Sequence, residues 1–194
     1  VPDGDVFLYA GDMCARGNRR ELEAFRQEFL TQLPHEHKIV VAGNHDYPFE
    51  CEDGSVLLPD CTYLEDKAVT INGVKIYGSP WQPEFCNWAF NLPRGEPLRE
   101  KWDMIPDDVD VLATHGPPKG IMDGVPRRAF SGTSYIKHVG CEELLGRVKE
   151  VQPELHVFGH IHEHGGVEEK DGVRFANVSF LGEGDAPYVF EIDS

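Results

Sequence analysis

Short apolar runs alternate with helical patterns in the first part of the chain. Four runs rich in Val, Ile, Leu and Phe are too short for helices and predict buried strands, at residues 5–10, 38–42, 109–114 and 155–158. Between the first two runs, apolar residues recur at helical spacing over 21–33, with Asn18 as the N-cap and Pro34 after the end. This strand, helix, strand unit predicts a right-handed parallel crossover.

The second half of the chain predicts one more helix and further strands. The helix covers residues 141–151, where apolar positions mark one face and Pro153 follows. Asn72-Gly73 indicates a hairpin between two short runs, and a turn at 170–172 indicates another. The additional strands are predicted at residues 69–71, 74–77, 173–178 and 188–192.

Two segments rich in Pro and Gly, 82–97 and 115–126, predict long ordered loops over an active face. Neither a repeat nor a linker divides the chain. We therefore expect residues 1–194 to form a single domain, which their number also suits.

The net charge of the chain restricts the kinds of partner that it is expected to bind. With 34 acidic and 18 basic residues the formal net charge is −16, which repels polyanions, so we expect no nucleic-acid polymer as partner. The sequence holds no apolar stretch of about 20 residues that would cross a membrane as a helix. Five scattered cysteines without a CxxC pair favour a reducing, cytoplasmic setting over a disulfide framework. The sequence leaves the oligomeric state open.

Polar side chains follow each of the four predicted central strands. Because the carboxyl ends of parallel strands meet at one edge of a sheet, these groups are expected to converge. Neutral imidazoles and carboxylates suit divalent transition metals, and an amide oxygen can complete such a site. The groups stand in the segments Gly11-Asp12, Gly43-Asn44-His45-Asp46, His115-Gly116 and Gly159-His160-Ile161-His162.

The chemistry of this set favours phosphate. A carboxylate such as Asp12 can bridge two ions about 4 Å apart, which lowers the pKa of a shared water and leaves hydroxide as a nucleophile. The bound cations would also attract a phosphate to an otherwise acidic protein. The acidity of the chain is therefore compatible with an anionic substrate of small size.

The motif order GD, GNHD, HG, GHxH resembles that of the calcineurin-like metallophosphoesterases. Further segments, at residues 75–83, 90–95, 114–118 and 156–163, are most similar to the metallophosphoesterase domain-containing subfamily. The resemblance implies an α/β fold, a four-layer sandwich of two mixed β-sheets flanked by helices. It also implies a centre of two divalent transition-metal ions, manganese, iron or zinc.

The resemblance assigns a role to each residue of the set. Asp12 would bridge both ions, Asn44, His115 and His160 would complete one metal site, and His162 would join the other. His45 would be the catalytic residue that stabilises the transition state and protonates the leaving oxygen. Asp46 would orient the loop. Arg16, with Asn44 and His45, would contact the substrate phosphate.

One departure from the family pattern affects the second ion. Family members open with a strand that ends in Asp-x-His, and no such motif precedes Asp12. We expect the chain to be an N-terminally incomplete metallophosphoesterase domain whose first strand is missing. The alternative interpretation is a half-built centre that holds one ion.

The favoured function is a phosphodiesterase that hydrolyses small, cyclic nucleotide phosphoesters through hydroxide held by the metals. One alternative is a weak or inactive scaffold that binds a nucleotide or a metal. Another is a protein phosphatase, which is less favoured because residues 11–17 lack the second acid of GDxVDRG. Four aromatic residues, Trp81, Phe85, Trp88 and Phe90, could stack on a nucleobase, but packing of their loop is the favoured interpretation.

Overall fold

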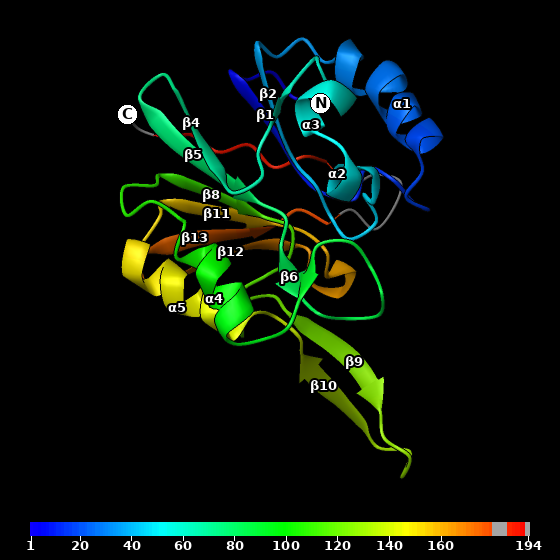
Figure 1. Ribbon diagram of the computed structural model, residues 1–194. Helices are drawn as coiled ribbons and strands as arrows, with labels where there is room; N and C mark the ends of the chain where they lie inside the picture. The colour runs from blue at the N-terminus through cyan, green and yellow to red at the C-terminus, as the bar shows by residue number, and fades with distance from the viewer. Residues whose placement is uncertain (180–185, 193–194) are drawn as a thin grey trace.

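The computed structural model describes residues 1–179 and 186–192, and two β-sheets form its centre (Figure 1). In the first sheet the strands are parallel in the order β1-β2-β3. In the second sheet the order is β12-β13-β11-β8-β5-β4, with β4 and β12 antiparallel to their neighbours and the inner strands parallel. The strands are β1 (Val6–Ala10), β2 (His37–Val41), β3 (Thr62–Tyr63), β4 (Lys67–Ile71), β5 (Val74–Ser79), β8 (Val111–Thr114), β11 (Leu155–Phe158), β12 (Gly166–Lys170) and β13 (Val173–Asn177).

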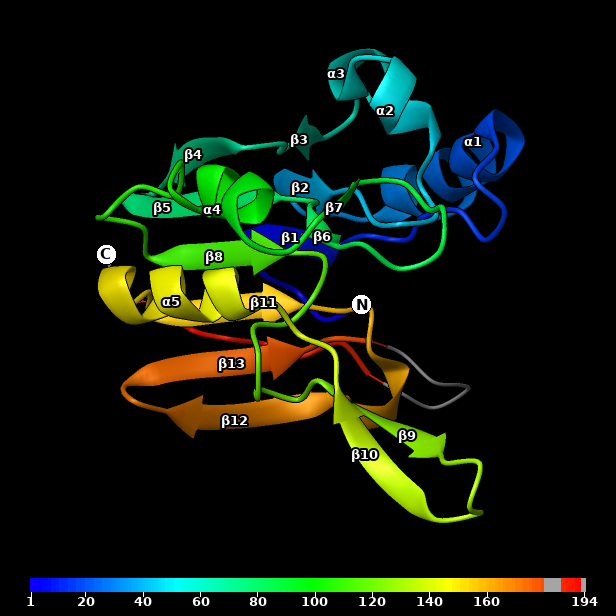
Figure 2. The same cartoon turned by 60° about the horizontal axis from the view of Figure 1, so that its bottom comes forward.

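Helices cover the outer faces of both sheets. The helix α1 packs on the first sheet, and α4 and α5 pack on the second (Figure 2). Two short strand pairs, β6 with β7 and β9 with β10, stand outside the two main sheets. These elements are α1 (Arg19–Glu28), η1 (Leu30–Gln32), α2 (Pro48–Cys51), α3 (Gly54–Leu57), β6 (Gln82–Pro83), β7 (Asn91–Leu92), α4 (Glu96–Trp102), β9 (Gly124–Arg128), β10 (Ser134–His138), α5 (Glu142–Val151) and η2 (His162–His164).

Three clusters of apolar side chains pack the four layers together. One strand can contribute side chains to two clusters because its side chains alternate between its two faces. In β2, Val40 faces α1 whereas Ile39 and Val41 face the second sheet, because successive side chains of a strand point to opposite faces. In the second sheet, Leu112 faces α5 and Val111 faces β1 and β2. Each of these fully buried aliphatic side chains contributes about 1.5–3 kcal/mol. The architecture confirms the predicted four-layer α/β fold.

Capping residues set the ends of the two long helices. The Asn18 side chain accepts a hydrogen bond from the Glu21 N–H at 3.1 Å, and η1 continues α1 after Phe29. At α5 the Cys141 thiol accepts from the Leu144 N–H, and Gln152 ends the helix in the left-handed conformation. Both helices therefore begin as predicted.

The prediction of a strand at residues 188–192 is wrong. Phe190 and Ile192 pack beside the apolar cluster between the sheets, but the segment forms no strand among the described residues. The Arg174 guanidinium, rather than a neighbouring strand, donates to the Glu191 carbonyl, at 3.1 Å. Alternating apolar side chains thus indicate burial here without backbone pairing.

The predicted loops contain structure that the pattern did not show. Segment 82–97 includes β6 and β7 and leads into α4, and segment 115–126 leads into β9. Both predicted hairpins are present, as β4 with β5 and β12 with β13. Among the described helices, none combines the length and the apolar character that crossing a membrane requires.

Candidate metal centre

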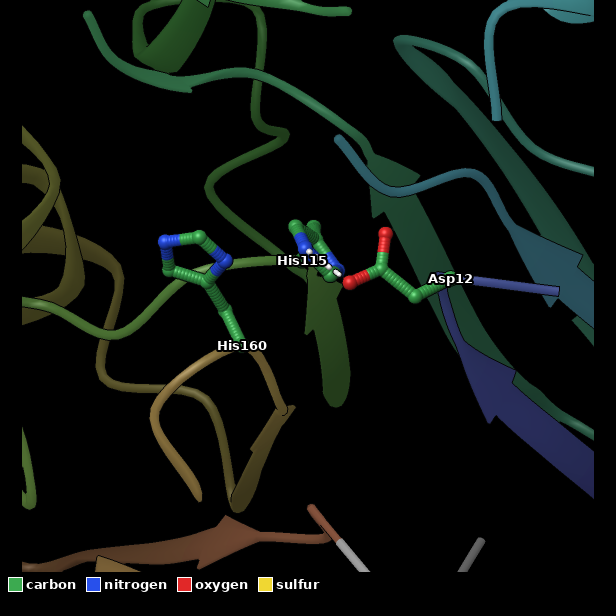
Figure 3. Close-up of side chains that lie close together, drawn as sticks. All are labelled: Asp12, His115 and His160. Carbon is green, nitrogen blue, oxygen red and sulfur yellow. Dashed lines mark ion pairs between the residues drawn. The ribbon is translucent and has the colours of Figure 1, made fainter. Parts of the chain in front are cut away.

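Four strands bring polar side chains to one edge of the two sheets. Asp12 follows β1 and Asn44 follows β2 in the first sheet, while His115 follows β8 and His160 follows β11 in the second. Figure 3 shows Asp12, His115 and His160 converging from three of these strand ends. One ligand atom from each of the three lies within 4.8 Å of the other two. The predicted convergence is therefore present in the fold.

The donor atoms around His115 are arranged as a cation would require. His115 Nδ1 lies 2.9 Å from the Ala10 carbonyl oxygen, so a proton on Nδ1 leaves a lone pair on Nε2. That Nε2 lies 2.8 Å from Asn44 Oδ1 and 3.4 Å from Asp12 Oδ2. Three lone-pair atoms facing one another fit a shared cation. A carboxylate, two imidazoles and an amide oxygen are also the donor set that divalent transition metals prefer.

The electrostatics of the three residues follow from burial and from their mutual contact. Burial lowers the pKa of His160 to about 3, which leaves its ring neutral and able to bind a metal. Burial opposes the charge of Asp12, but the neighbouring His115 and the His45 N–H lower the pKa of Asp12 to about 2. Burial also opposes the charge of His115, yet the Asp12 carboxylate raises the pKa of that ring.

Asp46 organises the backbone that carries Asp12. Its buried carboxylate accepts hydrogen bonds from the N–H groups of Gly43 (2.8 Å), Asp12 (2.8 Å), Met13 (3.2 Å) and Cys14 (2.8 Å). Burial raises the pKa of Asp46, while the Gly43 N–H opposes the rise. The carboxylate thus joins the loop after β1 to the loop after β2. This arrangement supports the predicted role of Asp46 in orienting the loop.

Two glycines allow the loops to approach so closely. A Cβ on Gly43 would collide with Asp12 Oδ1 and lie 2.6 Å from His115 Cε1. A Cβ on Gly11 would collide with His115 Nδ1 and lie 2.9 Å from the Ala42 carbonyl oxygen. Asp12 and His160 themselves have positive φ values of 62° and 68°, which are strained for residues with a Cβ. Strain of this kind is typical of functional sites.

His162 lies apart from the three converging residues but borders the same cavity. The cavity has a volume of about 540 Å³, and Asp12, His115, His160 and His162 line it at the metal-binding edge. Phe7, Tyr9, Phe25 and Phe29 are among its other lining residues. The side chain of His162 is exposed, at the start of η2. Its role in a second metal site stays a prediction.

Of the three residues predicted to contact the substrate, Asn44 lies beside His115, and His45 and Arg16 occupy different positions. The His45 N–H donates to Asp12 Oδ1 at 2.9 Å, and the His45 ring is half-buried with its centroid 5.2 Å from that of Trp88. His45 therefore stands directly beside the converging ligands. Arg16 is exposed, and its N–H donates to Glu21 at 2.8 Å. Arg16 is not among the residues that line the cavity.

The four aromatic residues of the predicted loop divide into two pairs. Trp81 and Phe90 pack edge to face at 5.5 Å, Phe90 is buried, and Trp81 Nε1 donates to Asp66 at 2.9 Å. Phe85 and Trp88 also pack edge to face, at 5.3 Å, and 52% of Phe85 is exposed. The first pair packs the loop onto the fold, as predicted. The second pair lies next to the site, because Trp88 packs against the His45 ring.

The sequence did not indicate two features of the site. The Ala10 carbonyl that orients His115 is a backbone group 105 residues away in the chain, so no side-chain pattern could reveal it. The contact between Trp88 and His45 likewise depends on how the loop folds back. In contrast, the glycines in Gly11-Asp12 and Gly43-Asn44 are visible in the sequence and could have indicated that the backbone passes close to other residues at these two positions.

Comparisons with known proteins identify relatives of this chain. A sequence model described as calcineurin-like phosphoesterase matches residues 1–164. Metallophosphoesterase domain-containing protein 1 of Homo sapiens is 44% identical over 205 residues, which cover 92% of this chain and 60% of the human protein. A UPF0046 protein of Caenorhabditis elegans is 39% identical over 212 residues, covering 99% of this chain and 69% of the worm protein.

A solved structure shares the fold. The phosphopantetheinyl hydrolase of Mycobacterium tuberculosis superposes with a TM-score of 0.55 at 18% identity, covering 90% of this chain and 78% of that one. The chain spans 60% of the length of the human and mouse relatives. Because the family model matches more than half of the chain and the human relative is 44% identical, this chain belongs to the calcineurin-like phosphoesterase family.

Proposed function

We propose that this chain hydrolyses phosphoesters in a metal-dependent reaction, with small and cyclic nucleotide phosphodiesters as substrates. The observation that carries the proposal is the convergence of Asp12, His115 and His160 within 4.8 Å, with Asn44 Oδ1 2.8 Å from His115 Nε2. Membership of the phosphoesterase family supports the reaction class. The single domain proposed for residues 1–194 would place the whole set in one catalytic unit.

The donor set would hold one divalent ion, and His162 is the candidate donor for a second. Manganese, iron and zinc all suit carboxylate and imidazole donors. Such ions would neutralise the charge of a phosphate ester and lower the pKa of water at the site. The chain orients the donors itself, because the Ala10 carbonyl holds the His115 ring and the His45 N–H holds Asp12.

His45 is the proposed general acid. Its N–H is tied to Asp12, so its ring is placed at the rim of the donor set without being one of the three converging ligands. From this position a ring nitrogen would donate a proton to the leaving oxygen of the ester. General acid catalysis by a positioned side chain contributes about 10²–10⁴-fold to a rate.

Phe85 and Trp88 are the proposed contacts for the nucleobase. Trp88 packs against His45, and Phe85 packs against Trp88 with half of its surface exposed. Stacking of a base on an aromatic side chain stabilises binding by about 1–3 kcal/mol. An organic group attached to a phosphate at His45 would thus meet an aromatic surface. The five free cysteines support a cytoplasmic setting as part of the proposal.

The reaction is tested with the chain stripped by a chelator and then supplied with manganese. We expect release of p-nitrophenol from bis(p-nitrophenyl) phosphate, and turnover of a cyclic nucleotide, only when the metal is restored. His115→Ala and Asn44→Ala should lose metal and activity together, whereas His37→Ala, at a half-buried histidine that begins β2, should keep both. Full activity in His115→Ala would overturn the proposal.

A second set of measurements separates binding from chemistry. Elemental analysis should find metal in the wild-type chain and in His45→Ala, while turnover by His45→Ala falls at least about 10²-fold. Loss of metal in His45→Ala would instead make His45 a ligand. Trp88→Ala should raise the KM for a cyclic nucleotide about tenfold with metal content unchanged. A wild-type chain that binds metal without turnover would support the scaffold alternative.

A further inference from the structure

The strands β9 and β10 form a ribbon that projects away from both sheets. Figures 1 and 2 show it extending from the body in two different views. Its antiparallel register pairs Arg127 with Tyr135 and Val125 with Lys137, and the described residues supply no third strand. A two-stranded ribbon is marginally stable in water on its own. A projecting ribbon is therefore a candidate for a contact surface.

The surface of the ribbon is apolar and basic, unlike the rest of the chain. Phe130 at its tip is fully exposed, and about half of Tyr135 (50%) and Ile136 (51%) is exposed. Residues 124–138 contain Arg127, Arg128 and Lys137 but no acid, in a chain whose net charge is −16. None of these three cations forms an ion pair with another described residue. Tyr135 and Ile136 point to opposite faces of the ribbon, so each face presents an exposed apolar side chain together with a cation, a combination that is typical of an interaction surface.

The base of the ribbon is anchored, so its direction is fixed by the fold. The buried Asp123 carboxylate lies 2.6 Å from His138 Nδ1 and accepts from the Gly140 N–H at 2.9 Å. The ring of His164 in η2 occupies the space beside Gly124, where a Cβ would lie 2.8 Å from it. Because β12 begins two residues after His164, the ribbon and β12 lie on the same side of the molecule (Figure 2).

The edge of β12 is complementary to the ribbon. Among the described strands β12 pairs with β13 alone, and none of them lies along its other edge. It carries Glu168, Glu169 and Lys170, so its net charge is negative, and an exposed Val167 (48%). Other edge strands differ in charge, since β4 carries only a lysine, Lys67, and β1 carries no charged residue. Charge therefore selects β12 as the match for a basic ribbon.

We propose that two copies of this chain form a closed dimer in which the ribbon of each copy lies along β12 of the other. On one face of the ribbon Arg127, Tyr135 and Lys137 lie together, because cross-strand partners and alternate residues share a face. Val167 and Glu169 share a face of β12 for the same reason. The contact joins cations to carboxylates and covers apolar side chains, and strand addition supplies backbone hydrogen bonds. Reciprocal use of both surfaces closes the assembly with two-fold symmetry.

The test measures the mass of the wild-type chain and of two charge-reversed variants by sedimentation. The ribbon variant is Arg127→Glu with Lys137→Glu, and the strand variant is Glu168→Lys with Glu169→Lys. We expect the wild type to be a dimer and each variant to dissociate with a constant raised at least about tenfold. An equal mixture of the two variants should form a dimer again, because each ribbon then meets a β12 of opposite charge.

A matched control separates the proposed contact from net charge. The control Lys67→Glu with Lys149→Glu makes the same change in net charge as the ribbon variant, but on exposed residues of β4 and α5. It should leave the dimer intact. The wild-type dimer should also weaken when salt rises from about 0.05 M to about 0.5 M, which needs no variant. A monomeric wild type at about 100 µM and low salt would overturn the proposal. So would a salt-insensitive dimer, a dimer that survives both reversals, or assemblies larger than two chains.

Discussion

Replacing Asp46 by Asn tests whether one carboxylate holds the candidate metal centre together. In the structure Oδ2 accepts from the Gly43, Asp12 and Met13 N–H groups, and Oδ1 accepts from the Cys14 N–H. An asparagine can place its single oxygen on the side with three donors. Its NH₂ group then faces the Cys14 N–H, so that buried donor has no acceptor.

The geometry sets the size of the effect. A buried donor left without a partner destabilises the folded state by about 1–3 kcal/mol. The three remaining hydrogen bonds also weaken, because hydrogen bonds to a charged acceptor are roughly twice as strong as neutral ones. We therefore expect Asp46→Asn to lose about 2–4 kcal/mol of the free energy of unfolding. A loss of this size is large against the 5–15 kcal/mol that is usual for a domain.

Two measurements follow the change from stability to the metal centre. Urea denaturation of metal-free protein gives the free energy of unfolding, and calorimetric titration with manganese gives the metal affinity. Because Asp46 fixes the strained backbone of Asp12, the affinity should fall at least about tenfold. The matched control is Asp53→Asn, the same chemical change at the exposed N-cap of α3, where asparagine caps equally well.

Two outcomes would contradict this role of Asp46. If the free energy of unfolding of Asp46→Asn lies within about 0.5 kcal/mol of the wild-type value, the four N–H groups do not depend on the carboxylate. If stability falls but manganese binds as before, Asp46 supports the loop without positioning the ligand. The control variant should change neither quantity.

Two further predictions concern buried groups near the site. Burial lowers the pKa of His156 from 6.5 to about 3, so between these values the unfolded chain binds a proton that the folded chain does not. Stability should then fall as pH drops below 6.5, and from pH 7 to pH 5 the wild type should lose about 2 kcal/mol more than His156→Gln in urea denaturation. Equal losses would show that His156 does not titrate. Gly43→Ala should lower manganese affinity at least about tenfold in the same titration, because its Cβ would displace Asp12 or His115. Gly146→Ala in α5, where a Cβ meets nothing within 4 Å, should instead stabilise by about 0.4–1 kcal/mol without affecting the metal.

The sequence by itself predicted the elements that carry the candidate site. The four central strands, the crossover helix and both hairpins follow from local patterns, because strand and helix periodicity and turn residues act over a few positions. The order of the strand-end motifs indicated which residues would meet. Asp12, Asn44, His115 and His160 do meet at one edge, as parallel strands require.

Local patterns misjudged elements whose state depends on distant contacts. Residues 188–192 alternate like a strand, yet Phe190 and Ile192 are half-buried without a neighbouring strand to pair with. The ribbon of β9 and β10 lies in a region whose first part predicted a loop. Its basic and apolar side chains became informative once the fold placed the ribbon on the same side of the molecule as β12, which carries two glutamates.

Only the tertiary structure decided the distances within the site. The Ala10 carbonyl orients His115, and Asp46 accepts from the N–H groups of Asp12, Met13 and Cys14, although these partners are far apart in the chain. Such contacts depend on how the two sheets pack, because packing sets positions to within an ångström whereas periodicity sets only which face a side chain occupies. The sequence therefore determined which groups this protein brings together, and the packing of its sheets determined that three of them come close enough to share an ion.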